Sequence, residues 1–315
     1  MDRNFRLRLA IGICALLLCL QSGVFNMAAA ALSQKETLSV LLFLQTGRLP
    51  RFSDLTTPQN PIETQPTTPE IAPQTPVFST DDLISVQYFC DYRPDLSALL
   101  TQKLTWSLRG DAPTVLIVHS HATEGYAGTE NYRSLDETQN MIAIGAEIAR
   151  VLEAGGIRVV HDKTLHDHPD YDAAYSNARS TIAEYLQKYP TISLVLDIHR
   201  DASDSASGQL ITSATVGGQK SAQLMLVVGT DAGGNHHPDW QENLSVALKL
   251  SALLEAENPG IIRPIQLRRE RFNMDLTAGS LLVEVGAAGD SLTEAKIAAN
   301  ALARAILSLA DGYLQ

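Results

Sequence analysis

Short apolar runs alternate with amphipathic segments of helical length over most of the chain, and this alternation restricts the fold more than any other feature. The apolar runs lie at residues 114–118, 157–160, 192–198, 224–228 and 281–285. The helical segments lie at residues 136–152, 172–189, 244–257 and 293–309. Runs that are apolar at nearly every position are typical of strands buried on both faces of a parallel sheet. The pattern therefore predicts an α/β domain in which helices cover both faces of a mostly parallel sheet.

The ends of the predicted helices carry recognisable signals. Gly155-Gly156 follows the first helix, and Pro190 follows the second. Ser291 and Glu294 stand in capping-box spacing at the start of the last helix. We therefore expect the helices to begin and end close to these residues.

A different composition marks the N-terminal part. Residues 1–32 combine Arg3, Arg6 and Arg8 with a long apolar stretch, which predicts a secretion signal or an uncleaved membrane anchor. The alanines at residues 28–31 suit a signal peptidase, whereas the apolar stretch is almost as long as the ~20 residues that span a bilayer. In both cases the basic residues stay in the cytoplasm and the remainder of the chain is exported.

Two further segments follow before the predicted catalytic domain. Residues 33–49 are rich in apolar side chains and form a juxtamembrane segment. Residues 50–81 form a linker rich in proline and threonine, with seven of the 14 prolines of the chain. This composition predicts an extended segment that holds residues 82–315, the catalytic domain, at a distance from the membrane.

Charge and cysteine content narrow the possible functions. The formal charge of −11 argues against nucleic-acid binding, because a nucleic-acid site needs a basic face. Cys14 and Cys19 lie in the apolar stretch, so an exported domain keeps only Cys90. We therefore expect no intramolecular disulfide in that domain.

Side chains that can bind a metal follow three of the predicted strands. They belong to His119-Ser120-His121-Ala122-Thr123-Glu124, to Asp197-Ile198-His199-Arg200-Asp201 and to Glu284. The carboxyl ends of parallel strands are where such sheets carry their sites. A catalytic Zn²⁺ takes three imidazole or carboxylate ligands and leaves a fourth position for water. His121, Glu124 and His199 supply that set, and Glu284 would accept the proton of the water, which predicts a one-zinc hydrolase.

Neighbouring residues leave parts of this assignment open. On an alternating strand end His119 points the same way as His121, so it is either the ligand or a hydrogen-bond partner of one. Arg200 is available to stabilise the oxyanion of the reaction, to orient the ligands or to pair with Asp201. Asp197 is placed to accept a hydrogen bond from a ligating imidazole.

Some of these residues also have a purely structural interpretation. Glu284 stands between two valines, where an unpaired carboxylate costs several kcal/mol, and its alternative role is an ion pair with Arg200 or Arg271. Three clustered histidines fit a solvated loop or cleft rim better than a second metal site, namely His161, His166 and His168.

Taken together, these segments resemble the stage II sporulation protein P family. The resemblance rests on residues 115–126, 194–202, 225–230 and 281–286 and on the order of the segments between them. It implies a zinc amidase/carboxypeptidase-like hydrolase fold and a membrane-anchored peptidoglycan hydrolase of endospore-forming bacteria. The activities implied are N-acetylmuramoyl-L-alanine amidase and endopeptidase on the stem peptides.

The resemblance also implies a place and partners. The enzyme would be anchored by its N-terminal helix in the mother-cell membrane at the sporulation septum, with the catalytic domain outside the cytoplasm. It would thin the septal wall during engulfment together with the sporulation stage II proteins D and M.

Two comparisons qualify the resemblance. The chain reads Phe272-Asn273-Met274-Asp275 where the family is expected to have a Tyr-Asn-Gln-Asp run. Asp136 is expected to cap a helix, but distant amidases place a carboxylate ligand near a corresponding helix, which makes Asp136 the rival of Glu124. An exported zinc carboxypeptidase and a non-catalytic wall-binding scaffold are the alternative functions.

Overall fold

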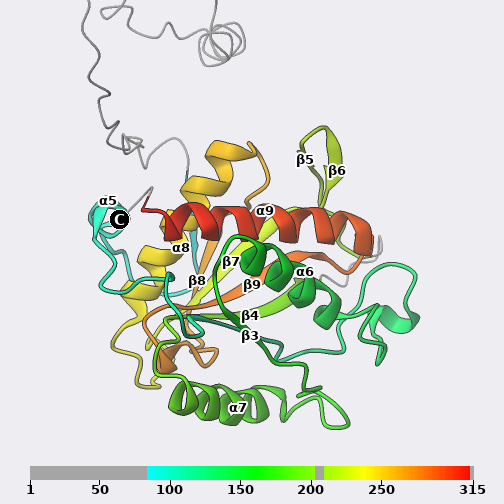
Figure 1. Ribbon diagram of the computed structural model, residues 1–315, viewed down its shortest axis with the longest axis horizontal. Helices are drawn as coiled ribbons and strands as arrows, with labels where there is room; N and C mark the ends of the chain where they lie inside the picture. Colours follow the sequence, from blue (N-terminus) through cyan, green and yellow to red (C-terminus); the bar gives the residue numbers. More distant parts are fainter. Residues whose placement is uncertain (1–83, 203–208, 313–315) are drawn as a thin grey trace, which may run out of the picture. The chain divides into compact units, whose positions relative to one another are not determined.

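A seven-stranded sheet forms the centre of the computed structural model, which describes residues 84–202 and 209–312 (Figure 1). The strands, in spatial order, are β1 (Val86–Tyr88), β8 (Ile265–Arg268), β7 (Leu224–Gly229), β9 (Ser280–Ala287), β4 (Leu194–Asp201), β2 (Val115–Val118) and β3 (Val159–His161). Within this sheet every neighbouring pair is parallel except β7 and β9. The predicted mostly parallel sheet is therefore confirmed.

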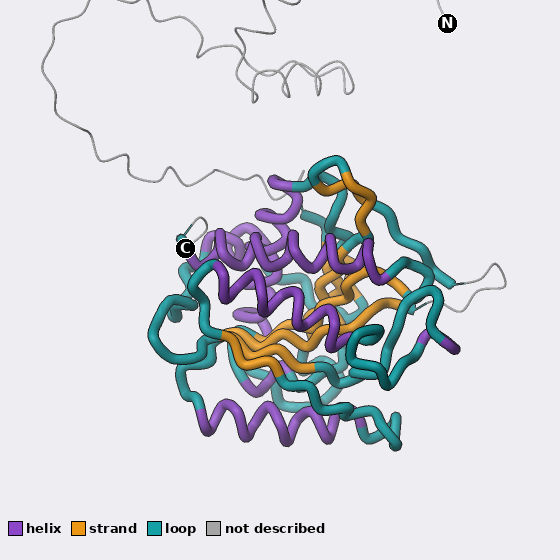
Figure 2. Tube along the Cα trace, turned by 45° about the vertical axis from the view of Figure 1, so that its right-hand side comes forward, coloured by secondary structure: helices purple, strands orange, loops and turns teal. Residues whose placement is uncertain are grey.

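Helices cover both faces of the sheet (Figure 2). One face carries α6 (Met141–Ala154), α8 (Trp240–Glu257) and α9 (Leu292–Ala310), and the other carries α7 (Ala174–Lys188). The smaller elements are α5 (Leu96–Thr101), the 3₁₀ turns η1 (Glu130–Tyr132) and η2 (Met274–Leu276), and the hairpin of β5 (Ala214–Val216) and β6 (Gln219–Ser221). The predicted helices on both faces are therefore also confirmed.

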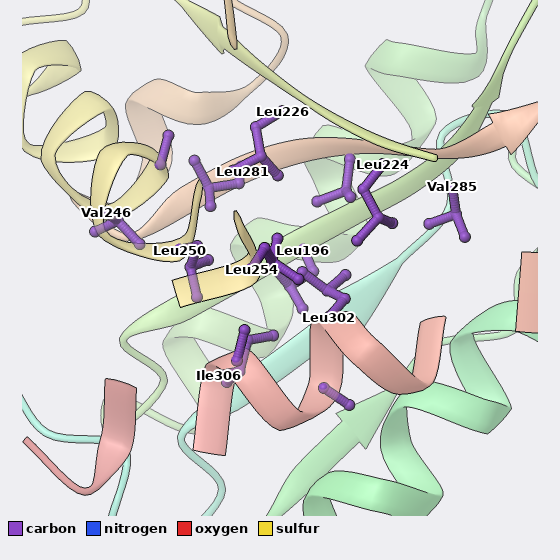
Figure 3. Close-up of a cluster of buried hydrophobic side chains, with 14 of the residues drawn as sticks. Leu196, Leu224, Leu226, Val246, Leu250, Leu254, Leu281, Val285, Leu302 and Ile306 are labelled. Carbon is purple, nitrogen blue, oxygen red and sulfur yellow. The ribbon is translucent and has the colours of Figure 1, made fainter. Parts of the chain in front are cut away.

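The larger part of the core lies between the sheet and the three-helix face. Figure 3 shows strand side chains of β4, β7 and β9 meeting apolar side chains of α8 and α9, all of them buried: Leu196, Leu224, Leu226, Leu281, Val285, Val246, Leu250, Leu254, Leu302 and Ile306. Burying one such side chain contributes about 1.5–3 kcal/mol to folding. This packing fixes which face of each strand points away from α7.

Strand alternation then decides where the polar residues of β4 and β9 point. In β4, Leu196 and Ile198 belong to the three-helix core, while Val195 packs in the cluster under α7. Because side chains alternate along a strand, Asp197 and His199 face the α7 side. In β9, Val283 and Val285 belong to the three-helix core, so Glu284 also faces the α7 side.

Some element ends differ from the prediction. The helix expected from residue 136 begins at Met141, and Asn140 caps it by accepting a hydrogen bond from the backbone N–H of Ile142. The capping box of Ser291 and Glu294 is present at the start of α9. The strands β1 and β8, at one side of the sheet, and the β5–β6 hairpin have no counterpart in the prediction.

The segments predicted to anchor and extend the chain lie outside the described residues. These are the N-terminal helix at residues 1–32, the juxtamembrane segment at 33–49 and the linker at 50–81. Among the helices of residues 84–202 and 209–312, none has the length and apolar character needed to cross a bilayer. The anchor therefore remains a prediction from the sequence.

Candidate functional site

His199 and Glu284 are direct neighbours at the carboxyl ends of β4 and β9. The two strands pair in parallel, and His199 is in register with Glu284. Glu284 is only partly exposed, and its Oε2 atom is buried without a hydrogen-bond partner in the described part of the chain. Gly286, at a φ of 71°, follows in β9, where the register with β4 shifts. The strand pairing therefore holds the imidazole and the carboxylate side by side.

A turn directly after β2 brings His121 and Glu124 to the same place. The backbone N–H of Glu124 donates to the carbonyl of His121 over 3.1 Å, which closes the turn. Glu124 Oε2 lies 3.6 Å from His199 Nδ1, and the ring centres of His121 and His199 are 5.6 Å apart. His121, Glu124, His199 and Glu284 are thus brought together in the structure.

The environment of these side chains favours positive charge. Burial alone would lower the pKa of His199, but the Asp197 carboxylate raises that pKa well above its ordinary value. Burial raises the pKa of Glu284 to about 8, with the neighbouring Glu124 carboxylate adding to the effect. Carboxylates on several sides therefore create a negative potential at His199, which suits a cation.

The donor atoms only partly form a metal cluster. In residues 84–202 and 209–312, no three His, Cys, Asp or Glu side chains are arranged as a ready-made metal site. However, His121 Nδ1, His199 Nε2 and Glu284 Oε2 are buried polar atoms without a hydrogen-bond partner among these residues. Buried polar atoms are normally paired, because an unpaired one costs about 1–3 kcal/mol. The atoms of His121 and Glu284 are available to a ligand or a substrate, whereas His199 Nε2 lies 3.0 Å from Asp197 Oδ1, which leaves Nδ1 of His199 for a metal.

The distances between the grouped side chains can be compared with those at a zinc site. Two ligand atoms of a tetrahedral zinc are about 3.3 Å apart, and two imidazoles that share the ion have ring centres about 5 Å apart. The corresponding separations are 3.6 Å between Glu124 and His199 and 5.6 Å between His121 and His199. The residues present fit a zinc ion after a small inward movement of their side chains.

The carboxylate of Asp197 lies beside the imidazole of His199. Asp197 Oδ1 lies 3.0 Å from His199 Nε2, although not in hydrogen-bond geometry. The same carboxylate accepts hydrogen bonds from the backbone N–H of Ser120 at 2.8 Å and from its hydroxyl at 2.5 Å. Burial alone would raise the pKa of Asp197, but His199 and Ser120 lower it to about 2. A charged Asp197, itself held by Ser120, therefore lies against the imidazole of His199 and favours its positive charge.

His119 does not point the same way as His121, and that expectation is wrong. His119 continues the face of Val115 and Ile117 in β2, which is the face of α6. Its Nδ1 lies 3.2 Å from the carbonyl of Ile198, and its Nε2 lies 2.9 Å from His161 Nε2. The chain turns between the two histidines, so His121 lies on the α7 side of the sheet instead.

Gly145 in α6 offers a test of this arrangement. A Cβ at this position would lie 2.5 Å from His161 Nε2 and 2.6 Å from His119 Nε2. Alanine gains about 1 kcal/mol of helix propensity over glycine, but overpacking a core costs about 1–3 kcal/mol. We expect Gly145→Ala to lower the free energy of unfolding by up to about 2 kcal/mol, as measured by urea denaturation. Unchanged or increased stability would contradict the packing of His119 and His161 against α6.

Arg200 is occupied by the loop that carries Glu124. Its Nε donates to the carbonyl of Gly125 and its Nη2 to the carbonyl of Tyr132, each over 3.1 Å. Its Nη1 lies 3.6 Å from Glu124 Oε1, and its backbone N–H donates to Glu124 Oε2 over 3.2 Å. These contacts favour a role for Arg200 in holding the loop and the carboxylate rather than in contacting the oxyanion.

Two other predicted residues lie away from this group. Asp136 is exposed, does not cap α6, and accepts hydrogen bonds from the backbone N–H and the hydroxyl of Thr138. Arg271, the suggested partner of Glu284, pairs with Asp275 at 3.2 Å. In the part of the chain described here, no ion pair is formed by Glu284.

The predicted solvated histidine loop is wrong for two of its three members. His166 is buried, and its nitrogens contact the carbonyl of His119 and the hydroxyl of Thr181, each over 3.0 Å. His161 is partly buried against His119. His168 is exposed and lines a neighbouring cavity. His161 and His166 therefore both contact His119, the residue directly after β2.

Two tyrosines of the site have no signal in the sequence motifs. The ring of Tyr171 stacks on His121 with a centre distance of 4.2 Å. The ring of Tyr175, in the first turn of α7, lies edge-on to His121 at 5.4 Å and nearly parallel to His199 at 6.1 Å. Only their place at the start of a predicted helix after the His-rich loop could have drawn attention to them.

An open cavity of about 970 Å³ adjoins the site. Its lining includes Thr123, Arg133, Asp167 and Tyr171. Arg133 donates to Thr123 over 2.6 Å and lies 4.3 Å above the ring of Tyr171, whose ring stacks on His121. The cavity thus leads to the grouped side chains and is large enough for part of a polymeric substrate.

Solved structures with some likeness to the chain are cell-wall amidases. The N-acetylmuramoyl-L-alanine amidase AmiC2 of Nostoc punctiforme is 17% identical, with a TM-score of 0.41 over 64% of this chain and 99% of that one. The CwlD amidase from Clostridioides difficile, in complex with the GerS lipoprotein, is 13% identical, with a TM-score of 0.40 over 64% of this chain and 98% of that one. Both TM-scores are low, so nothing about the site rests on them.

Sequence comparison is more specific. The chain is 28% identical over 210 residues to the stage II sporulation protein P of Bacillus subtilis (strain 168), which covers 62% of this chain and 50% of that relative. The chain thus spans about half the length of the relative that it matches. The family model of stage II sporulation protein P (SpoIIP) matches residues 55–307, which include all four grouped side chains. The chain therefore belongs to the stage II sporulation protein P family.

Proposed function

We propose that the chain is a zinc-dependent peptidoglycan hydrolase, with N-acetylmuramoyl-L-alanine amidase activity and endopeptidase activity on the stem peptides. The observation that carries the proposal is the convergence of His121, Glu124, His199 and Glu284 at the carboxyl ends of three neighbouring strands. Family membership supports the bacterial wall as the substrate. An intact set of donors and a buried carboxylate argue against a non-catalytic scaffold.

The chain's own residues divide the chemistry among them. His121, Glu124 and the Nδ1 atom of His199 would hold Zn²⁺, which when bound polarises a carbonyl and activates water. Glu284 takes the proton of the attacking water on a carboxylate oxygen and passes it to the leaving nitrogen. Burial raises the pKa of Glu284 to about 8, so this group holds a proton readily, and the positive charge of a bound zinc would favour the carboxylate form that accepts the proton of water.

Asp197→Asn tests the support of His199. A carboxylate beside a ligating imidazole sets the orientation and basicity of the ring, and its loss typically costs about 10–100-fold in metal affinity. We expect Asp197→Asn to lower zinc affinity by about 10–100-fold in a competition titration with a chromogenic chelator. Asp201→Asn is the matched control, because Asp201 pairs with Arg263 at 2.8 Å and contacts no proposed ligand. Equal affinity of wild type and Asp197→Asn would contradict the assignment of His199.

Location and partners belong to the same proposal. The apolar N-terminal stretch at residues 1–32 and the linker at 50–81 support a membrane-anchored enzyme whose catalytic domain acts outside the cytoplasm. Membership of the sporulation family supports action on the septal wall during engulfment, with the stage II proteins D and M as partners. The charge of −11 supports delivery by tethering rather than by attraction to an anionic wall.

The bond that is cut distinguishes the proposal from an exported zinc carboxypeptidase. Purified sacculi are digested with the chain, and the soluble and insoluble products are identified by mass spectrometry. Amidase activity releases whole stem peptides and leaves glycan strands without peptide, and endopeptidase activity opens cross-links. Products in which the stem peptides are only shortened by their terminal residue would contradict the proposal and favour a carboxypeptidase.

A further inference from the structure

Cleavage of an amide places negative charge on the carbonyl oxygen, and enzymes normally aim a fixed hydrogen-bond donor at that charge. Arg200 is the cation nearest in sequence to the predicted ligands, but its guanidinium is directed to Gly125, Tyr132 and Glu124. The remaining donor must come from a side chain that faces the site and has a hydrogen atom to offer.

Tyr175 meets both conditions. Its ring borders those of both His121 and His199, at centre distances of 5.4 Å and 6.1 Å. The side chain is partly exposed, and within the described residues its hydroxyl has no hydrogen-bond partner and is not among the enclosed unpaired atoms. The hydroxyl is therefore accessible to a substrate that enters the site. By contrast, the buried Tyr126 donates its hydroxyl to the carbonyl of Val285 at 2.6 Å.

Residues 272–275 pack against the first turns of α7 and contact Tyr175 there. Asn273 Nδ2 donates to the carbonyl of Tyr175 over 2.8 Å, and the ring of Phe272 lies 5.8 Å from that of Tyr175. Asp275 accepts two hydrogen bonds from Arg179, at 2.8 Å and 2.7 Å. Phe272 and Asn273 both have positive φ angles, 49° and 60°, which are uncommon for residues other than glycine. Backbone strain of this kind persists where the surrounding contacts enforce it.

We propose that Tyr175 is a catalytic residue whose hydroxyl donates a hydrogen bond to the carbonyl oxygen of the scissile amide as that oxygen becomes negatively charged. No proton is transferred from the phenol, and the proton of the attacking water still passes through Glu284. This inference rests on the proposed amide hydrolysis and adds the donor that Arg200 does not supply.

The test is Tyr175→Phe in the full chain, which keeps the ring and its stacking but removes the hydroxyl. Loss of one donor to a developing oxyanion typically costs about 10²-fold in kcat. We expect kcat on a soluble muramyl-peptide substrate to fall about 10²-fold, with KM and zinc content unchanged. A phosphinate that replaces the scissile amide should bind more weakly by a similar factor, while the product peptide binds as in wild type.

Tyr185→Phe is the matched control. It removes a phenol from the same helix at a position that packs in the cluster with Leu116 and Ile182, and we expect wild-type kinetics. Both variants should show the thermal unfolding of wild type. Tyr175→Phe overturns the inference if kcat and phosphinate affinity stay within about twofold of an active wild type, or if zinc is lost. An inactive, zinc-free wild type would instead contradict the proposed function itself.

Discussion

Glu284→Gln is expected to abolish wall hydrolysis while the protein keeps its zinc. Glutamine has the shape of glutamate but cannot accept the proton of water, and a positioned general base is typically worth 10²–10⁴-fold in rate. We expect kcat to fall about 10³-fold, measured by release of stem peptides from purified sacculi. Because Glu284 is proposed to be a base and not a ligand, zinc content should remain at the wild-type value.

The variant also removes a destabilising feature. Burial raises the pKa of Glu284 to about 8, which shows that its charge is poorly solvated. A neutral amide at this position avoids that cost, so thermal unfolding should occur at the wild-type temperature or above it. Retained hydrolysis in Glu284→Gln would exclude Glu284 as the base. Loss of zinc would make it a ligand instead.

His121→Ala is expected to release the metal, whereas His119→Gln keeps it. His121 lies with His199 on the α7 side of the sheet, and His119 is turned to His161 on the α6 side. Loss of a residue that only positions a ligand typically lowers metal affinity about 10–100-fold. Loss of the ligand itself should lower zinc affinity by more than this, and hydrolysis should be lost together with the zinc. The zinc content of the two dialysed variants, measured by inductively coupled plasma mass spectrometry, shows which histidine binds the metal.

His119→Gln serves as the control because glutamine can still contact Ile198 and His161. His119 is fully buried, so a lower unfolding temperature is expected without loss of zinc. If His119→Gln lost the metal and His121→Ala kept it, the alternative ligand would be the correct one. The turn after β2 would then have to bind zinc from its other side.

Strand patterns made the sheet predictable and drew attention to all four grouped residues, which stand at or just beyond the ends of predicted strands. The apolar pattern of β4 is interrupted by His199 and other polar residues near its carboxyl end, and that of β9 is interrupted there by Glu284. Parallel pairing of these strands then follows from the intervening helical segments, and it places the two residues in register. Regular secondary structure carries this information because its periodicity is short and local.

The directions and contacts of side chains in and near turns were harder to predict. Alternation from β2 indicates one direction for His119 and His121, but the strand ends at Val118 and the turn sends His121 to the other side. The role of Arg200 depends on carbonyl groups of the loop near Tyr132, which no side-chain pattern reveals. Such contacts depend on loop geometry rather than on local sequence periodicity.

One side of the sheet was unpredictable for a related reason. The strands β1 and β8 are short, with three and four residues, and their apolar character is incomplete. Tyr175 and the residues 272–275 meet only through tertiary packing, since about a hundred residues separate them in the chain. The departure at Phe272 nevertheless pointed to this segment, which contacts Tyr175 beside the proposed ligands.

Metal removal and return on a single preparation test the central claim most directly. Zinc content and release of stem peptides from sacculi are measured before treatment, after dialysis against a chelator, and after addition of one equivalent of Zn²⁺. We predict one zinc per chain at the start, loss of metal and hydrolysis together, and recovery of both with one equivalent. Full hydrolysis by the metal-free chain would contradict the zinc site of His121, Glu124 and His199.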